Sequence, residues 1–136
     1  MTVFHTQYEK HAYDYTLGMD ITHYDGIVCC SGDGIVHEVI NAIFHRRDKD
    51  EFLQYIPIGV IPGGTSNGLA KSICEASGEK YSAELCSYLI IKGYSRNLDI
   101  MEIETPSREK NIYSFLSVAW GLLADVDLES EAYLIK

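Results

Sequence analysis

Apolar residues along this chain form short continuous runs that alternate with stretches of helical spacing. Residues 27–30 (IVCC) and 58–61 (IGVI) are apolar runs that each lead into a glycine-containing turn, as a buried strand does. Behind the first turn, residues 35–44 carry apolar side chains three and four positions apart, which predicts an amphipathic helix. Residues 27–44 therefore form a strand, a turn and a helix in that order.

The same order follows the second apolar run, so the strand–turn–helix unit occurs twice. Two such units favour an α/β layered fold with a parallel sheet. The last predicted strands look antiparallel. We therefore expect a part of the chain with a different architecture to begin near residue 94. The remaining predicted elements are a short strand at 3–5, a weak helix at 8–17, helices at 69–76 and 83–91, and strands at 98–103 and 112–120.

Composition excludes several classes of protein. Eleven basic against twenty acidic residues give a net charge of −9, which disfavours a nucleic-acid partner. A length of 136 residues fits about one domain. No apolar run approaches the ~20 residues of a membrane-spanning helix. The four cysteines form no C-x-x-C pair, which disfavours a zinc site and favours thiols buried in a reducing compartment. We expect a cytoplasmic protein.

The turn Gly63-Gly64-Thr65-Ser66-Asn67 follows the second apolar run and opens a helix. Glycines admit an anion close to the backbone, and a helix N-terminus presents free N–H groups to it. This turn is a candidate phosphate cradle, with hydroxyl groups as further donors. The alternative is an ordinary strand–helix turn with a Thr or Ser cap. Neither standard phosphate-loop spacing is present.

The turn Ser31-Gly32-Asp33-Gly34 follows the first apolar run. A carboxylate between two glycines at a helix start can reach into a cleft and accept a hydroxyl proton, as phosphoryl transfer requires. The alternative is an aspartate that caps its own helix.

Several motifs together make the chain resemble the lipid kinases of the sphingosine kinase and diacylglycerol kinase superfamily. The stretch SGDG with the following E-x-x-N resembles their first motif, and IPGGTSNGLA resembles their second nucleotide loop. The stretch AWG with ADVDLESE, at 119–131, closely resembles the sphingosine kinase version. Thr6 with His11-Ala12 resembles an upstream T-x-x-x-x-H-A pattern.

The resemblance implies ATP-dependent phosphorylation of the primary hydroxyl of a sphingoid base. It implies a three-layer nucleotide-binding α/β domain with a parallel sheet, and Mg²⁺ that accompanies the ATP phosphates. Asp33 takes the general-base position. Asp127 contacts the lipid head group, where a carboxylate would pair with the sphingoid ammonium, and Ser117 lies nearby. The nucleotide-side positions are Thr6, Ser31, Gly32, Gly34, Gly63, Gly64, Thr65, Ser66 and Asn67.

The sequence departs from that family in one position and in extent. Ser66 stands where a glycine is usual, and an earlier strand and most of a β-rich second domain have no counterpart. We expect residues 1–93 to be a partial ATP-binding domain and 94–136 to be the start of the substrate-binding domain. No metal-ligand set is expected, because Ser130 breaks the calcium-loop pattern of the acidic stretch.

Two other functions fit the same motifs. One is a diacylglycerol- or ceramide-type kinase, whose substrate lacks the cation. The other is a truncated relative without catalytic activity. For any such lipid kinase we expect transient contact with a membrane surface.

Overall fold

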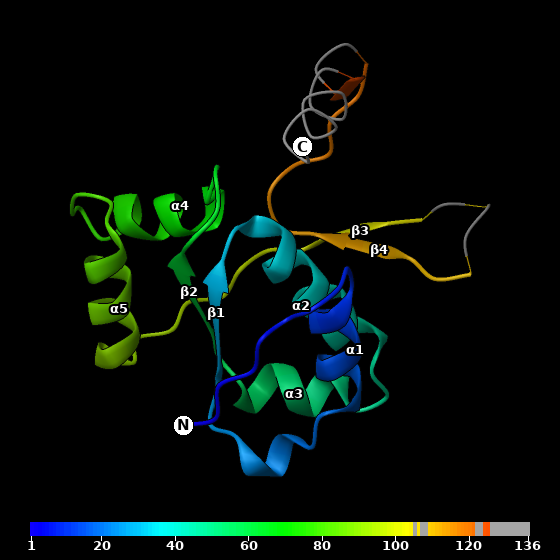
Figure 1. Ribbon diagram of the computed structural model, residues 1–136. Coiled ribbons are helices and arrows are strands. Elements are labelled where there is room, and N and C mark those ends of the chain that lie inside the picture. The colour runs from blue at the N-terminus through cyan, green and yellow to red at the C-terminus, as the bar shows by residue number, and fades with distance from the viewer. Residues whose placement is uncertain (105, 107–108, 122–123, 126–136) are drawn as a thin grey trace.

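The computed structural model describes residues 1–136 except 105, 107–108, 122–123 and 126–136 (Figure 1). Helices and strands alternate along the chain. They are α1 (His11–Gly18), the short 3-10 helix η1 (Ile21–His23), β1 (Ile27–Ser31), α2 (Asp33–His45), α3 (Lys49–Tyr55), β2 (Ile58–Pro62), α4 (Gly68–Ala76), α5 (Ala83–Lys92), β3 (Met101–Ile103) and β4 (Ile112–Ser114).

Strands β1 and β2 pair in parallel, with Ile27 opposite Ile58 and Ser31 opposite Pro62. The predicted α/β fold with a parallel sheet is thereby confirmed. Helix α2 contacts β1, and α4 and α5 contact β2, so that Figure 1 shows the strands between two groups of helices. The contact with α5 is close: a Cβ added at Gly59 would lie 2.9 Å from the Ile90 side chain.

Helix α2 supplies the centre of the core. Its apolar stripe is buried, including Val36 and Ile43, and packs with Phe52 of α3 and Val60 of β2. Burial of several branched side chains on one face explains why this helix forms where its spacing predicts it.

Polar side chains of α2 and of the residue after it hold both ends of α1. The Glu38 carboxylate accepts hydrogen bonds from the backbone N–H groups of Lys10, Ala12 and Tyr13, at 3.1 to 3.3 Å. Arg46 follows α2 and donates to the Thr16 carbonyl at 2.6 Å, near the other end of α1. A helix of eight residues with a weakly amphipathic pattern has little stability of its own. The hydrogen bonds of Glu38 and Arg46 pair backbone groups at its ends and thereby stabilise it.

Three expectations about single elements are corrected, and one helix was not predicted. Residues 3–5 form no strand; Phe4 instead stacks on Tyr15 of α1, with ring centroids 3.9 Å apart. Helix α1 begins at His11 rather than at residue 8. Helix α3 was not predicted, because Phe52 is its one buried residue and leaves little periodic pattern. The strand predicted at 112–120 ends at Ser114, whose hydroxyl donates to the Ser117 carbonyl across a turn.

Strands β3 and β4 pair antiparallel, with Glu102 opposite Tyr113, as expected for the last strands. No helix among the described residues is long and apolar enough to cross a membrane.

We predict that Glu38→Gln destabilises α1 selectively, because a neutral amide has one acceptor oxygen for three N–H donors. The expected loss is about 1 kcal/mol of unfolding free energy. Hydrogen exchange measured by mass spectrometry would show faster exchange at residues 10–17. Glu51→Gln, at an exposed position of α3, is the matched control. Equal exchange in both variants would contradict the assignment of Glu38 as the support of α1.

Candidate phosphate-binding and catalytic site

The two glycine-rich turns meet at the carboxyl ends of β1 and β2. The Gly63 N–H donates to the Ser31 carbonyl at 3.0 Å and carries the strand pairing into the turns. A Cβ added at Gly64 would lie only 2.4 Å from the Gly32 Cα. The backbones of Gly32 and Gly64 are therefore in direct contact. Any larger residue at position 64 would force the two turns apart.

Asp33 joins these turns through its side chain. It is the first residue of α2, and its carboxylate accepts hydrogen bonds from the N–H groups of Gly68 at 2.7 Å and Leu69 at 3.2 Å. Those two residues are the first of α4. The alternative that Asp33 caps its own helix is wrong; it caps a helix that begins 35 residues later. The half-buried carboxylate is thereby held in one orientation.

Asn67 shapes the turn between β2 and α4. It has left-handed backbone angles (φ 51°, ψ 47°) and is buried. Its side-chain amide accepts from the Gly64 N–H at 2.9 Å and donates to the Gly64 carbonyl. Thr65 and Ser66 lie exposed at the tip between them. The alternative of a Thr or Ser cap on α4 is wrong, because the Asp33 carboxylate accepts the hydrogen bonds from the first N–H groups of that helix.

The start of α2 has the features of an anion site. Its N-cap residue is Gly32, and no side chain of the described residues caps its first turn. A 13-residue helix carries a partial positive charge of roughly half an elementary charge at that end. Gly34 is exposed and has nothing within 4 Å of an added Cβ. Open N–H groups beside exposed hydroxyls suit a phosphate group.

The other predicted residues lie at different distances from this junction. Ser31 is half-buried and donates its hydroxyl hydrogen to the Gly32 carbonyl at 3.0 Å. Thr6 is exposed in the segment before α1, and none of the described hydrogen bonds links it to either turn. Ser117 is exposed shortly after β4. Asp127 lies outside the described residues.

One neighbour of the junction escaped sequence reasoning. A Cβ added at Gly68 would lie 3.2 Å from Leu116 Cδ1 and 3.6 Å from Asp33 Oδ2. The segment after β4 thus passes beside the catalytic candidate. The sequence did not single out Leu116, because an apolar residue in a predicted strand has the same pattern as a residue of the hydrophobic core.

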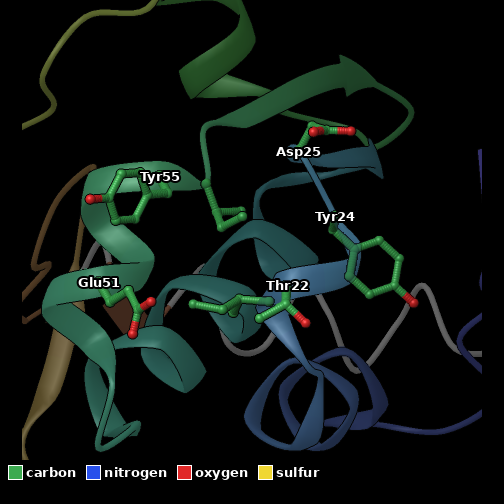
Figure 2. A pocket seen from close by; sticks show the side chains of 7 residues that line it. Thr22, Tyr24, Asp25, Glu51 and Tyr55 are labelled. Atoms are coloured by element: carbon green, nitrogen blue, oxygen red, sulfur yellow. The ribbon is translucent and has the colours of Figure 1, made fainter.

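A concavity lies at the end of the sheet opposite this junction, just before β1. This pocket of about 360 Å³ is lined by residues including Thr22, Tyr24, Asp25, Glu51 and Tyr55 (Figure 2). The hydroxyls of Tyr24 and Tyr55 point to opposite sides in Figure 2, so its polar groups do not converge. Among the described residues, no group of three or more His, Cys, Asp or Glu is arranged to hold a metal ion.

Comparison with known proteins identifies the family. Residues 1–103 match the diacylglycerol kinase catalytic domain. The chain therefore belongs to the diacylglycerol kinase catalytic domain family.

Within that family, the chain is similar to sphingosine kinases over most of its length. It is 41% identical to sphingosine kinase 2 of Arabidopsis thaliana, over 94% of this chain and 26% of that protein. It is 36% identical to sphingosine kinase 2 of Homo sapiens, over 94% of this chain and 20% of that protein. It is 40% identical to sphingoid long chain base kinase 5 of Saccharomyces cerevisiae, over 95% of this chain and 18% of that protein. The chain thus spans about a quarter or less of the length of these relatives.

We predict that Gly64→Ala separates the two turns, because the added methyl group meets the Gly32 backbone. The expected cost is about 1–3 kcal/mol of unfolding free energy. Thermal unfolding measures the loss, with Gly18→Ala as the control. Gly18 ends α1 with nothing within 4 Å of an added Cβ, so alanine there is neutral or slightly stabilising. Two variants of equal stability would disprove the close contact.

Proposed function

We propose that this chain carries the nucleotide side of an ATP-dependent lipid kinase that phosphorylates the primary hydroxyl of a sphingoid base. One observation carries the proposal: the Asp33 carboxylate is fixed where two glycine-rich turns meet, beside an uncapped helix N-terminus. Phosphoryl transfer depends mainly on positioning and charge stabilisation, and this junction offers both.

The nucleotide phosphates bind at the two turns. The contact between Gly32 and Gly64 leaves a side-chain-free surface, which lets a phosphate approach the backbone. The exposed hydroxyls of Thr65 and Ser66 add donors at the tip, and Asn67 keeps that tip in shape. The other nucleotide-side positions in this proposal are Thr6, Ser31, Gly34 and Gly63. Mg²⁺ arrives with ATP and neutralises phosphate charge.

Asp33 acts as the general base. The lipid hydroxyl oxygen forms a bond to the γ-phosphorus, the bond from that phosphorus to the ADP oxygen breaks, and the hydroxyl proton passes to the carboxylate. A carboxylate oxygen has two lone-pair directions, so each oxygen of Asp33 can accept one backbone hydrogen bond and still face a hydroxyl.

The lipid head group pairs with Asp127, and Ser117 is the second residue assigned to the lipid side. A sphingoid base carries an ammonium group, and a carboxylate recognises it through a charge-assisted hydrogen bond. The names of the similar proteins, sphingosine and sphingoid long chain base kinases, support this substrate class. The lipid lives in a bilayer, so we propose transient contact with a membrane surface.

We predict that the longest natural chain that contains this sequence is stabilised thermally by MgATP and that it transfers labelled phosphate to sphingosine. Asp33→Asn removes the proton acceptor and should lower the rate about 100-fold or more. It should lower the melting temperature by only a few degrees, since its amide oxygen still accepts from one N–H of α4. Asp25→Asn, at an exposed position, is the control. Absence of MgATP stabilisation would favour the non-catalytic relative.

We predict that Asp127→Asn weakens sphingosine far more than diacylglycerol as a substrate, because only sphingosine carries the cation. The KM for sphingosine should rise about tenfold or more, with the KM for MgATP unchanged. Initial rates on mixed micelles of each lipid measure the effect. Unchanged sphingosine kinetics would favour the diacylglycerol- or ceramide-type alternative.

A further inference from the structure

Asn41 holds strand β4 through a pair of hydrogen bonds. Its side-chain amide donates to the Tyr113 carbonyl at 2.8 Å and accepts from the Tyr113 N–H at 2.9 Å. Both residues are buried. The amide thus occupies the edge of β4 that faces away from β3, as a neighbouring strand would. Asn41 makes this contact from α2, the helix that begins with Asp33.

Two contacts further along α2 reinforce the attachment. His45 lies 2.9 Å through its Nε2 from the Asn111 carbonyl, and the Phe44 ring stacks on Tyr113 with centroids 4.3 Å apart. Strand β4 and the residue before it therefore lie against the second half of α2. Of these contacts, the Asn41 pair satisfies both backbone groups of a single residue of β4.

The chain after Tyr113 runs back along α2 towards the catalytic end. Asn41 follows Asp33 by eight helical residues, which corresponds to about 12 Å of helix. Leu116 follows Tyr113 by three residues, which span at most about 11 Å when extended. Leu116 nevertheless reaches Gly68, beside the Asp33 carboxylate. The bond from the Ser114 hydroxyl to the Ser117 carbonyl fixes a turn in this short segment, so the position of Tyr113 and this turn together set the position of residues 114–117.

We propose that Asn41 is a positioning residue for the hydroxyl substrate: it sets the segment that leads to Ser117 against Asp33. This inference rests on the proposed function. Asn41 itself contacts neither nucleotide nor lipid in this account and acts through the Tyr113 backbone. Loss of its amide leaves a buried N–H and a buried carbonyl without partners, which weakens the attachment of β4 to α2.

The nucleotide side is attached independently of Asn41. The bonds between Asp33 and α4, and between Gly63 and Ser31, involve neither Asn41 nor β4. A loss of Asn41 should therefore separate the two substrates kinetically. Sphingosine use suffers, while MgATP binding does not.

The test compares wild type, Asn41→Leu, Asn41→Asp and Asn111→Leu in the longest natural chain that contains this sequence. Asn41→Leu removes both bonds; Asn41→Asp keeps the acceptor and removes the donor. Asn111→Leu is the matched control, since its side chain bonds only to Glu102 among the described contacts and its backbone bond to His45 remains. Measurements are KM and kcat for each substrate, and hydrogen exchange of residues 112–116.

In Asn41→Leu, we expect the KM for sphingosine to rise about tenfold or more, the KM for MgATP to stay within about twofold, and exchange at Tyr113 to be at least about tenfold faster. Asn41→Asp should show a smaller change in the same direction, which also covers the case that the leucine variant fails to fold. Asn111→Leu should match wild type.

An active wild type whose Asn41 variants keep the sphingosine KM, or raise both KM values equally, would overturn the positioning role alone. An inactive wild type that also fails to bind MgATP would overturn the proposed function, and the positioning role with it. The exchange measurement separates these cases, because it reports on the contact between Asn41 and β4 without any substrate.

Discussion

The structure depends on the way polar side chains of α2 satisfy backbone groups of its neighbours. Glu38 holds the first turn of α1, Asn41 holds β4, and Asp33 holds the first turn of α4. Short helices and a three-residue strand have few internal hydrogen bonds and many unpaired ends. One buried helix that supplies those partners, while its apolar stripe forms the core, can order all three elements at once.

This arrangement gives Asp33 a structural role beside the catalytic role that we propose for it. Its two hydrogen bonds to Gly68 and Leu69 fix the carboxylate before any substrate arrives. A carboxylate fixed by backbone N–H groups cannot drift with loop motion, and fixed geometry is the main contribution a protein makes to phosphoryl transfer. The contact between Gly32 and Gly64 holds the two glycine-rich turns together through backbone alone.

Local patterns predicted the elements well where burial is periodic and poorly where it is not. The stripe of residues 35–44 gave α2 almost to its ends, and Gly93, with φ 71°, ended α5 as expected. Helix α3 was missed because Phe52 is its one buried residue. The strand predicted at 112–120 was too long. The hydrogen bond from the Ser114 hydroxyl to the Ser117 carbonyl marks a turn of the chain, although apolar residues continue beyond it.

The sequence by itself determined the alternation of strands and helices, the parallel sheet and the placement of two glycine-rich turns at its carboxyl end. These follow from spacing and residue type within a few positions. The tertiary structure alone decided which side chain meets which backbone. Asp33 caps a helix 35 residues away and Asn41 pairs with a residue 72 positions later. No local period encodes such partners, because a hydrogen bond between distant segments exists only after the core has brought them together.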